Sequence, residues 1–295
     1  MSRRLQDLVA SKLMLLITIF SSLIVFVVAS VLFQRSLPIL ISQPLSELFL
    51  SSSWRPVQGD FGFYAFIIGT LLVTALAMLI AIPVCLLSAI YLSEYAPSKI
   101  RGILKPPIDI LAGIPSVVYG LWGVLLIVPL IRQYLAPSVG ATTTGYSLLA
   151  GGIVLAIMVF PIIISISEEV FRAVPFDVRE ASVALGATKW QTVKHVVMRK
   201  ALPGVTAAVI LGFSRAFGET MAVLMVMGNV AQIPSSLFDP AYSLPALIAN
   251  NYGEMMSIPL YDSALLLAAF ILFILMAFFS IAARIVLSRI ERRSA

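Results

Sequence analysis

Residues 168–203 read EEVFRAVPFDVREASVALGATKWQTVKHVVMRKALP, a polar stretch between two strongly apolar ones. Pro175 should end any helix that arrives from the preceding apolar segment, because proline removes a backbone donor and clashes with the turn before it. Asp177 and Glu180 have the spacing of a capping box, a pattern that starts helices. The first half of this stretch therefore predicts a short helix over 178–185.

The second half predicts a turn and a further helix. Gly186 suits the left-handed residue that commonly ends a helix, and Thr188 with Gln191 repeats the capping-box spacing. A helix of about two turns is marginal by itself in water, so the first one needs a surface to dock on. Val183 and Leu185 offer apolar side chains for a groove on a partner.

The chain around this stretch has the composition of an integral membrane protein. Of its 295 residues 60% are hydrophobic and 12% are charged, whereas a soluble domain has about 25% charged residues. The net charge of +6 is therefore a topology signal and gives no support to nucleic-acid binding. The single cysteine, Cys85, excludes an internal disulfide, and a lone His195 argues against a metal site in this chain.

Six apolar segments are long enough to span a bilayer, which takes about 20 residues. They are 13–33, 64–92, 108–131, 147–167, 203–228 and 263–287. The first follows basic residues as a signal peptide does, but a signal core has only about 7–15 apolar residues, so we expect an uncleaved anchor. The sequence thus predicts an all-α integral membrane protein with six transmembrane helices.

The basic residues predict the orientation. If the N-terminus is cytoplasmic, sixteen of the 20 Lys and Arg residues fall on the cytoplasmic side, and only Arg35, Arg55 and Arg132 fall outside. Because Lys and Arg collect in cytoplasmic loops, we expect both termini and the stretch 168–203 in the cytoplasm. The proline-rich outer segment 230–262 should then pack on the outer mouth or dip partly into the membrane.

This pattern divides the chain into three parts. We expect an N-terminal anchor helix with an outer segment over 1–63, a transmembrane domain over 64–288 that contains the loop 168–203, and a short cytoplasmic tail over 289–295.

Within the loop, EASVALG followed by ATKWQTVKHVVM resembles the EAA motif of permease subunits of ABC importers. The motif positions fall on Glu180, Ala181, Ser182, Gly186, Val196 and Met198. Ser182 and Met198 are mild departures from the family pattern. Arg199 occupies the position at which the family has proline, a difference that affects the expected bend of the chain after the motif. The resemblance implies the type I ABC importer permease fold, in which this helix is the coupling helix, seated in a cleft of the ATPase subunit.

The chain has no G-x-x-x-x-G-K-[ST] phosphate loop. We therefore expect no cofactor and no enzyme activity in this chain, with ATP and magnesium bound by a partner ATPase.

Three further stretches narrow the family. AGIPSVVYGLWG (112–123), RAFGETMAVLMVMGN (215–229) and LFDPAYSLPALIAN (237–250) resemble the phosphate-specific importers, and their PstC-type permease more than their PstA-type. The resemblance implies a bacterial inner-membrane complex with a PstA-like permease, a PstB-like ATPase dimer and a PstS-like phosphate-binding protein. Its cargo would be inorganic phosphate.

Arg215 and Glu219 are the candidate substrate-path residues. Ionisable residues inside a span suggest a functional site, and at a spacing of four residues the two would pair on one helix face. A guanidinium fits phosphate oxygens, so incoming phosphate would compete with Glu219 for Arg215, and the resemblance places both residues in the path. Four neutral side chains are further candidate donors: Ser214, Thr220, Ser116 and Tyr119.

Other readings stay open. A sulfate- or molybdate-type ABC importer would use the same arginine, because one guanidinium serves any oxyanion. An ATPase-independent secondary anion transporter would also carry charges in its spans, but it would not need the coupling helix and would normally show an inverted repeat. A membrane-embedded enzyme would need clustered acidic or histidine residues, which the sequence does not offer.

Overall fold

The computed structural model describes residues 3–254 and 257–294, and these residues form a helical protein with one small hairpin. The long helices are α1 (Arg3–Ser42), α3 (Tyr64–Ile90), α4 (Ser98–Gly113), α8 (Leu148–Ala173), α11 (Met198–Phe217) and α14 (Tyr261–Ser294). The short helices are α2 (Leu45–Leu50), α5 (Ser116–Trp122), α6 (Val128–Leu130), α7 (Ala136–Ser138), α9 (Phe176–Ala184), α10 (Lys189–Thr192), α12 (Met221–Val226) and α13 (Leu244–Asn251).

Smaller elements join these helices. Strands β1 (Trp54–Arg55) and β2 (Asp60–Phe61) pair antiparallel around a 3₁₀ turn, Pro56–Gln58. Four π-helical turns continue the helices around them: Tyr91–Tyr95, Gly123–Ile127, Ile131–Leu135 and Val193–Val197.

Six helical stretches of the described chain are long and apolar enough to cross a membrane, as the sequence predicts. They are Val9–Ser42, Tyr64–Tyr95, Ser116–Ser138, Leu148–Ala173, Lys189–Phe217 and Tyr261–Ile290. The third begins later than the expected 108–131, because α4 ends at Gly113 and Ile114 is extended before Pro115. A residue before proline avoids the helical region, so 108–113 belong to a separate helix.

The fifth stretch is also placed differently from the expected 203–228. Its helix starts at Lys189 and stops at Phe217, and a turn through Gly218 separates it from α12. Residues beyond Phe217 therefore do not continue the long helix, although the sequence there remains apolar.

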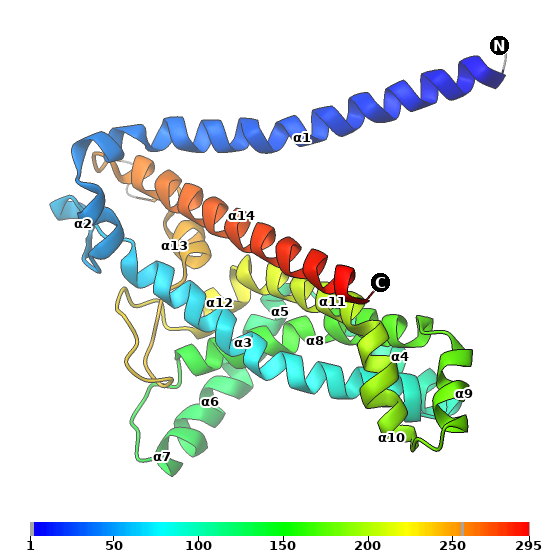
Figure 1. Ribbon diagram of the computed structural model, residues 1–295. Helices are drawn as coiled ribbons and strands as arrows, with labels where there is room; N and C mark the ends of the chain where they lie inside the picture. Colours follow the sequence, from blue (N-terminus) through cyan, green and yellow to red (C-terminus); the bar gives the residue numbers. More distant parts are fainter. Residues whose placement is uncertain (1–2, 255–256, 295) are drawn as a thin grey trace.

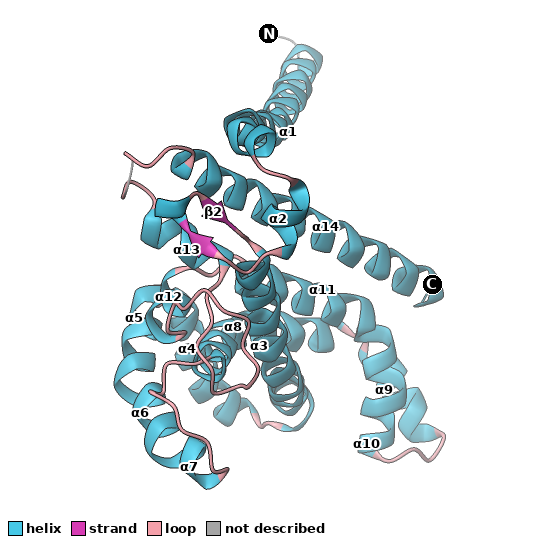
Figure 2. Ribbon diagram, turned by 90° about the vertical axis from the view of Figure 1, so that its left-hand side faces the viewer, coloured by secondary structure: helices cyan, strands magenta, loops and turns pink. Residues whose placement is uncertain are grey.

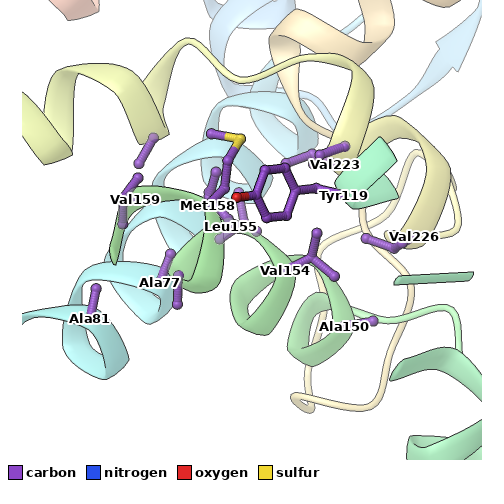
Figure 3. Packing of buried hydrophobic residues seen from close by; sticks show 14 of the residues in the cluster. Ala77, Ala81, Tyr119, Ala150, Val154, Leu155, Met158, Val159, Val223 and Val226 are labelled. Atoms are coloured by element: carbon purple, nitrogen blue, oxygen red, sulfur yellow. The ribbon is translucent and has the colours of Figure 1, made fainter. Parts of the chain in front are cut away.

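Helices α3 and α8 form the centre of the molecule and pack along each other, with α11 against both of them. Gly152 permits the contact, because a Cβ built there would lie 2.6 Å from Cδ2 of Leu76. Small residues at such contacts let membrane helices approach closely and gain van der Waals contact. Figure 3 shows the core on the α12 side of α8, where the ring of Tyr119 lies beside Met158.

The two ends of the bundle differ. Helices α2 and α13 lie at one end, near the hairpin, and α9 and α10 lie at the other (Figures 1 and 2). Trp54 forms aromatic contacts with Phe61, Phe63 and Phe66 at the α13 end. Residues of α13 are buried against this cluster, so 241–247 pack on the bundle, whereas many of the other described residues of 230–262 are exposed; residues 255–256 lie outside the described part.

Helix α1 contains the least buried of the six apolar stretches. It packs on α14, while its N-terminal half extends past the rest of the chain (Figure 1). Its apolar side chains face outward, with Phe26 72% exposed. Such a surface suits lipid or another membrane helix better than water.

Candidate functional site

The elbow, residues 174–192, contains the turn that the sequence predicts. Helix α9 ends at Ala184, and Gly186 follows with φ of +86°. The amide of Gly186 donates to the carbonyl of Val183 over 2.9 Å, and that of Ala187 donates to the carbonyl of Ser182 over 3.2 Å. This is the Schellman pattern of a helix end, which needs a left-handed residue at the position of Gly186.

The two predicted capping boxes have different outcomes. Thr188 accepts from the amide of Gln191, whose side chain accepts from the amide of Thr188, so the second box is confirmed. The first is wrong, because α9 starts at Phe176 directly after Pro175. Asp177 is therefore inside the first turn, where its carboxylate accepts from the amide of Val178 over 2.9 Å.

The elbow carries exposed apolar side chains. Leu185 is 90% exposed and Val183 is 56% exposed, and the motif residues Glu180 and Ala181 are also exposed. Ser182 differs, because its Oγ lies 2.9 Å from Oγ1 of Thr192 and joins the two arms of the elbow. An exposed leucine side chain buries little apolar surface against its own chain. Its exposure therefore favours contact with a partner.

A cleft of about 1120 Å³ lies beside the elbow, and Val183 is among the residues that line it. Its walls come from α9, the end of α8 and the Tyr91–Tyr95 turn, and they carry charges of both signs, including Arg172, Glu180 and Lys189. The elbow therefore stands away from the bundle on one side while its base is attached to it.

The base of the elbow holds an ion pair that the sequence reading missed. Arg179 donates from Nη2 to Oε1 of Glu94 over 2.8 Å and from Nε to Oε2 over 3.4 Å. The two residues are 85 positions apart in the sequence. From the sequence, Arg179 is only one of the basic residues that predict the orientation in the membrane. The feature of the sequence that could have indicated a role for Arg179 is its position directly before Glu180 in the motif.

A second group of charges, also missed, lies along α8. Glu168 is 1% exposed, with Nζ of Lys105 at 3.9 Å and Nη1 of Arg172 at 3.7 Å. These are loose contacts, and Oε1 of Glu168 has no hydrogen-bond partner. They join α4 to α8 near the elbow.

The path region comprises Arg215, Glu219 and their neighbours, and it differs from the expectation. Because α11 ends at Phe217, Arg215 and Glu219 do not share one helix face. Among the described residues, Arg215 has neither an ion-pair nor a hydrogen-bond partner, so the expected pair is not formed. Glu219 instead accepts from the amide of Ala222 over 3.2 Å at the start of α12.

Tyr119 lies on α5, which contacts α4 and α12. Its hydroxyl donates to the carbonyl of Leu111 at the end of α4 over 2.8 Å. Gly120 beside it marks a close crossing of α5 and α12, since a Cβ there would lie 2.5 Å from Sδ of Met225. Tyr119 therefore lies where α5 meets α4 and α12.

The other three neutral candidates are less engaged. Ser214 donates to the carbonyl of Ile210 over 3.0 Å within α11, and Thr220 donates to the carbonyl of Gly218 over 3.3 Å. Ser116 begins α5 and is half-buried. Within the described residues, no group of three or more His, Cys, Asp or Glu side chains is arranged to hold a metal.

Residues 81–293, which include both regions, match the family described as binding-protein-dependent transport system inner membrane component. The chain belongs to this family. It is a permease subunit of an ABC importer in the inner membrane, with several membrane spans, and by family it is not an enzyme.

Curated relatives agree with this family. The chain is 39% identical to the phosphate transport system permease protein PstC of Xylella fastidiosa, over 84% of this chain and 80% of that protein. It is 44% identical to the probable ABC transporter permease protein YqgH of Bacillus subtilis, over 70% of this chain and 66% of that protein.

Solved structures show the same fold. A bacterial ABC transporter involved in the import of the acidic polysaccharide alginate has a TM-score of 0.64 at 13% identity, covering 97% of this chain and 99% of that chain. The inward-facing MetNI methionine ABC transporter has a TM-score of 0.58 at 19% identity, covering 77% and 97%. At such identities the likeness concerns the fold alone, and the expected type I importer permease fold is confirmed.

Proposed function

We propose that this chain is a phosphate permease subunit, which moves inorganic phosphate across the inner membrane with energy from a separate ATPase. The observation that carries the proposal is the 39% identity to a phosphate permease over 84% of the chain. Arg215 supports it, because an ionisable residue in a membrane span, without a side-chain partner among the described residues, is a candidate for an ion path.

The elbow would be the point of contact with the ATPase. Its apolar residues Val183 and Leu185 are exposed, and the chain has no phosphate loop of its own. ATP and magnesium would therefore be held by two copies of a PstB-like subunit. A PstA-like permease would complete the path, and a PstS-like phosphate-binding protein would deliver the anion at the α13 end.

The orientation follows from the charges. The elbow and both termini would lie in the cytoplasm, because most Lys and Arg residues fall on their side. The segments 34–63 and 230–262 would face outward, with the transmembrane domain over 64–288 between them and the tail 289–295 inside. Cysteine labelling at Ser53 and Ser235 from outside, and at Ser98 and Lys189 from inside, tests this arrangement.

In the path, Arg215 would contact phosphate directly. A guanidinium offers several donors in one plane for the phosphate oxygens. The hydroxyls of Ser116, Tyr119, Ser214 and Thr220 would supply neutral donors. Glu219, which is not bonded to Arg215, would carry one negative charge near the path and keep binding weak enough for release.

The test is uptake into proteoliposomes that contain the purified complex. We expect phosphate uptake that requires both ATP and the phosphate-loaded binding protein and that a tenfold excess of sulfate does not reduce. Uptake that sulfate or molybdate blocks equally would favour a different oxyanion importer. Uptake without any ATPase subunit would favour a secondary transporter and would contradict the proposal.

A further inference from the structure

Arg179 lies where three elements of the chain meet. It belongs to α9, and its guanidinium bonds Glu94 in the turn after α3. It also donates to the carbonyl of Phe171 over 2.7 Å and of Pro175 over 3.3 Å, as well as to the carbonyl of Val174. One side chain thus joins the elbow to the ends of α3 and α8.

The chemistry of these bonds makes the junction rigid. The last carbonyls of a helix lack partners within the helix and carry partial negative charge, and a guanidinium has five donors in a fixed plane. The side chain of Arg179 is 17% exposed and that of Glu94 is 9% exposed. A pair that is so little hydrated is strongly disrupted when only one partner is removed.

The second arm of the elbow is attached to the same turn. Nζ of Lys189 lies 4.6 Å from the centre of the Tyr95 ring, within the range of a cation–π contact. Helices α3 and α8, in turn, pack along each other through the centre of the molecule. The base of the elbow is therefore bonded at two points to the pair of helices that forms the core.

We propose that Arg179 and Glu94 form a clamp that makes α9, α3 and α8 move as one body, so that a displacement of the elbow reaches the membrane core. This inference rests on the proposed function, since it presupposes an ATPase that moves the elbow. Arg179 is then a positioning residue for transport. We assign it no contact with the anion, and most of its side chain is buried.

A clamp differs from a residue that merely stabilises the fold. Without the clamp, the elbow still has its Schellman turn and its Thr188 cap, so the ATPase should still bind and hydrolyse ATP. Loss of the clamp should lower the number of anions transported per ATP hydrolysed. A purely structural role would instead lower assembly, hydrolysis and uptake together.

The first test measures that ratio in the reconstituted complex for Arg179→Gln, Arg179→Lys and Glu94→Gln. Arg199→Gln is the matched control, an exposed arginine in the same segment. We expect Arg179→Gln to lower the uptake-to-hydrolysis ratio about tenfold, which is a typical size for coupling between sites, and Arg179→Lys to rescue it only in part. Glu94→Gln should have a smaller effect, because the carbonyl bonds remain.

The second test does not depend on the anion. Spin labels at Ala184 on α9 and Leu87 on α3 should keep one distance when ATP binds to the wild-type complex. In Arg179→Gln the distance should broaden or shift by several ångströms on the scale of helix displacements. An unchanged ratio, equal losses of assembly and uptake, or identical distance changes in wild type and variant would overturn the clamp. If no ATPase subunit co-purifies with the wild-type chain, that result would instead overturn the proposed function.

Discussion

The elbow and the path region treat their polar groups in opposite ways. In the elbow, Arg179 has four acceptor groups around it, and both helix ends at the turn are capped. In the path region, the long helix breaks at Phe217, and Arg215 has no ion-pair or hydrogen-bond partner in the described part of the chain.

The difference fits the two tasks that we propose for this chain. A segment that passes force to the bundle must not deform, so its donors and acceptors are matched within the chain. A segment that an ion passes must keep some donors available, and it must hold the ion weakly enough to release it. Substitutions that remove Arg215, the turn or the cap should separate the two tasks, with effects that decrease in that order.

Arg215→Gln should have the largest effect. A hydrogen bond to a charged group contributes about 1.5–3 kcal/mol, so phosphate uptake should fall by at least about tenfold. Assembly should be normal, because the guanidinium bonds nothing in the described chain. Uptake assays with Arg132→Gln as the control measure this, and uptake near the wild-type level would remove Arg215 from the path.

The charge-swapped double variant, Arg215→Glu with Glu219→Arg, sharpens the same point. Since the two residues do not pair in the structure, the swap should assemble and remain inactive. Substantial recovery of uptake relative to the single variants would show that the pair forms during transport and joins helices.

Gly186→Val should have the next largest effect. No atom lies within 4 Å of a Cβ built on Gly186, so the substitution causes no clash. The positive φ alone should cost about 1–2 kcal/mol and turn α9 away from its partner, which should lower substrate-stimulated ATP hydrolysis about tenfold. Gly186→Asn is the matched control, because asparagine tolerates this conformation; equal losses in both variants would contradict the argument.

Thr188→Ala should have a smaller, local effect. Loss of an N-cap costs about 1 kcal/mol, so amide exchange in α10 should accelerate about fivefold while uptake falls less than twofold. Hydrogen exchange followed by mass spectrometry measures the change. Acceleration that extended into α8 would mean that the cap stabilises far more than the elbow.

The smallest effect concerns the loop at the α13 end. Hydrogen bonds from the Ser235 hydroxyl and from the amides of Ser236 and Ser235 hold the pKa of Asp239 below its usual value. Since the folded pKa is the lower one, the stabilisation is complete above the unfolded value of about 3.9 and is lost as pH falls through the folded value. Amide exchange at Ser236 should therefore rise below about pH 4 in wild type and be insensitive to pH in Asp239→Asn, after correction for intrinsic rates.

The sequence predicts the parts of this structure that depend on local patterns. The lengths of the apolar segments are sufficient to identify six spans. Gly186 and Thr188 are sufficient to predict where the turn of the elbow lies. It fails where an apolar run contains a break: Pro115 and Gly218 move two span boundaries, and the break at Gly218 removes the expected pair at Arg215. It also fails where contacts are distant along the chain, since nothing in either segment indicates that Arg179 meets Glu94.

The most direct test of the division of tasks compares Arg215→Gln with Gly186→Val in one preparation. Each complex is purified through a tag on this chain, and the bound ATPase and the ATP-driven phosphate uptake are both measured. We predict that Arg215→Gln retains the ATPase and loses uptake, whereas Gly186→Val loses stimulated hydrolysis and the bound ATPase together with uptake. Retention of a fully stimulated ATPase in Gly186→Val, or loss of the ATPase in Arg215→Gln, would contradict the account.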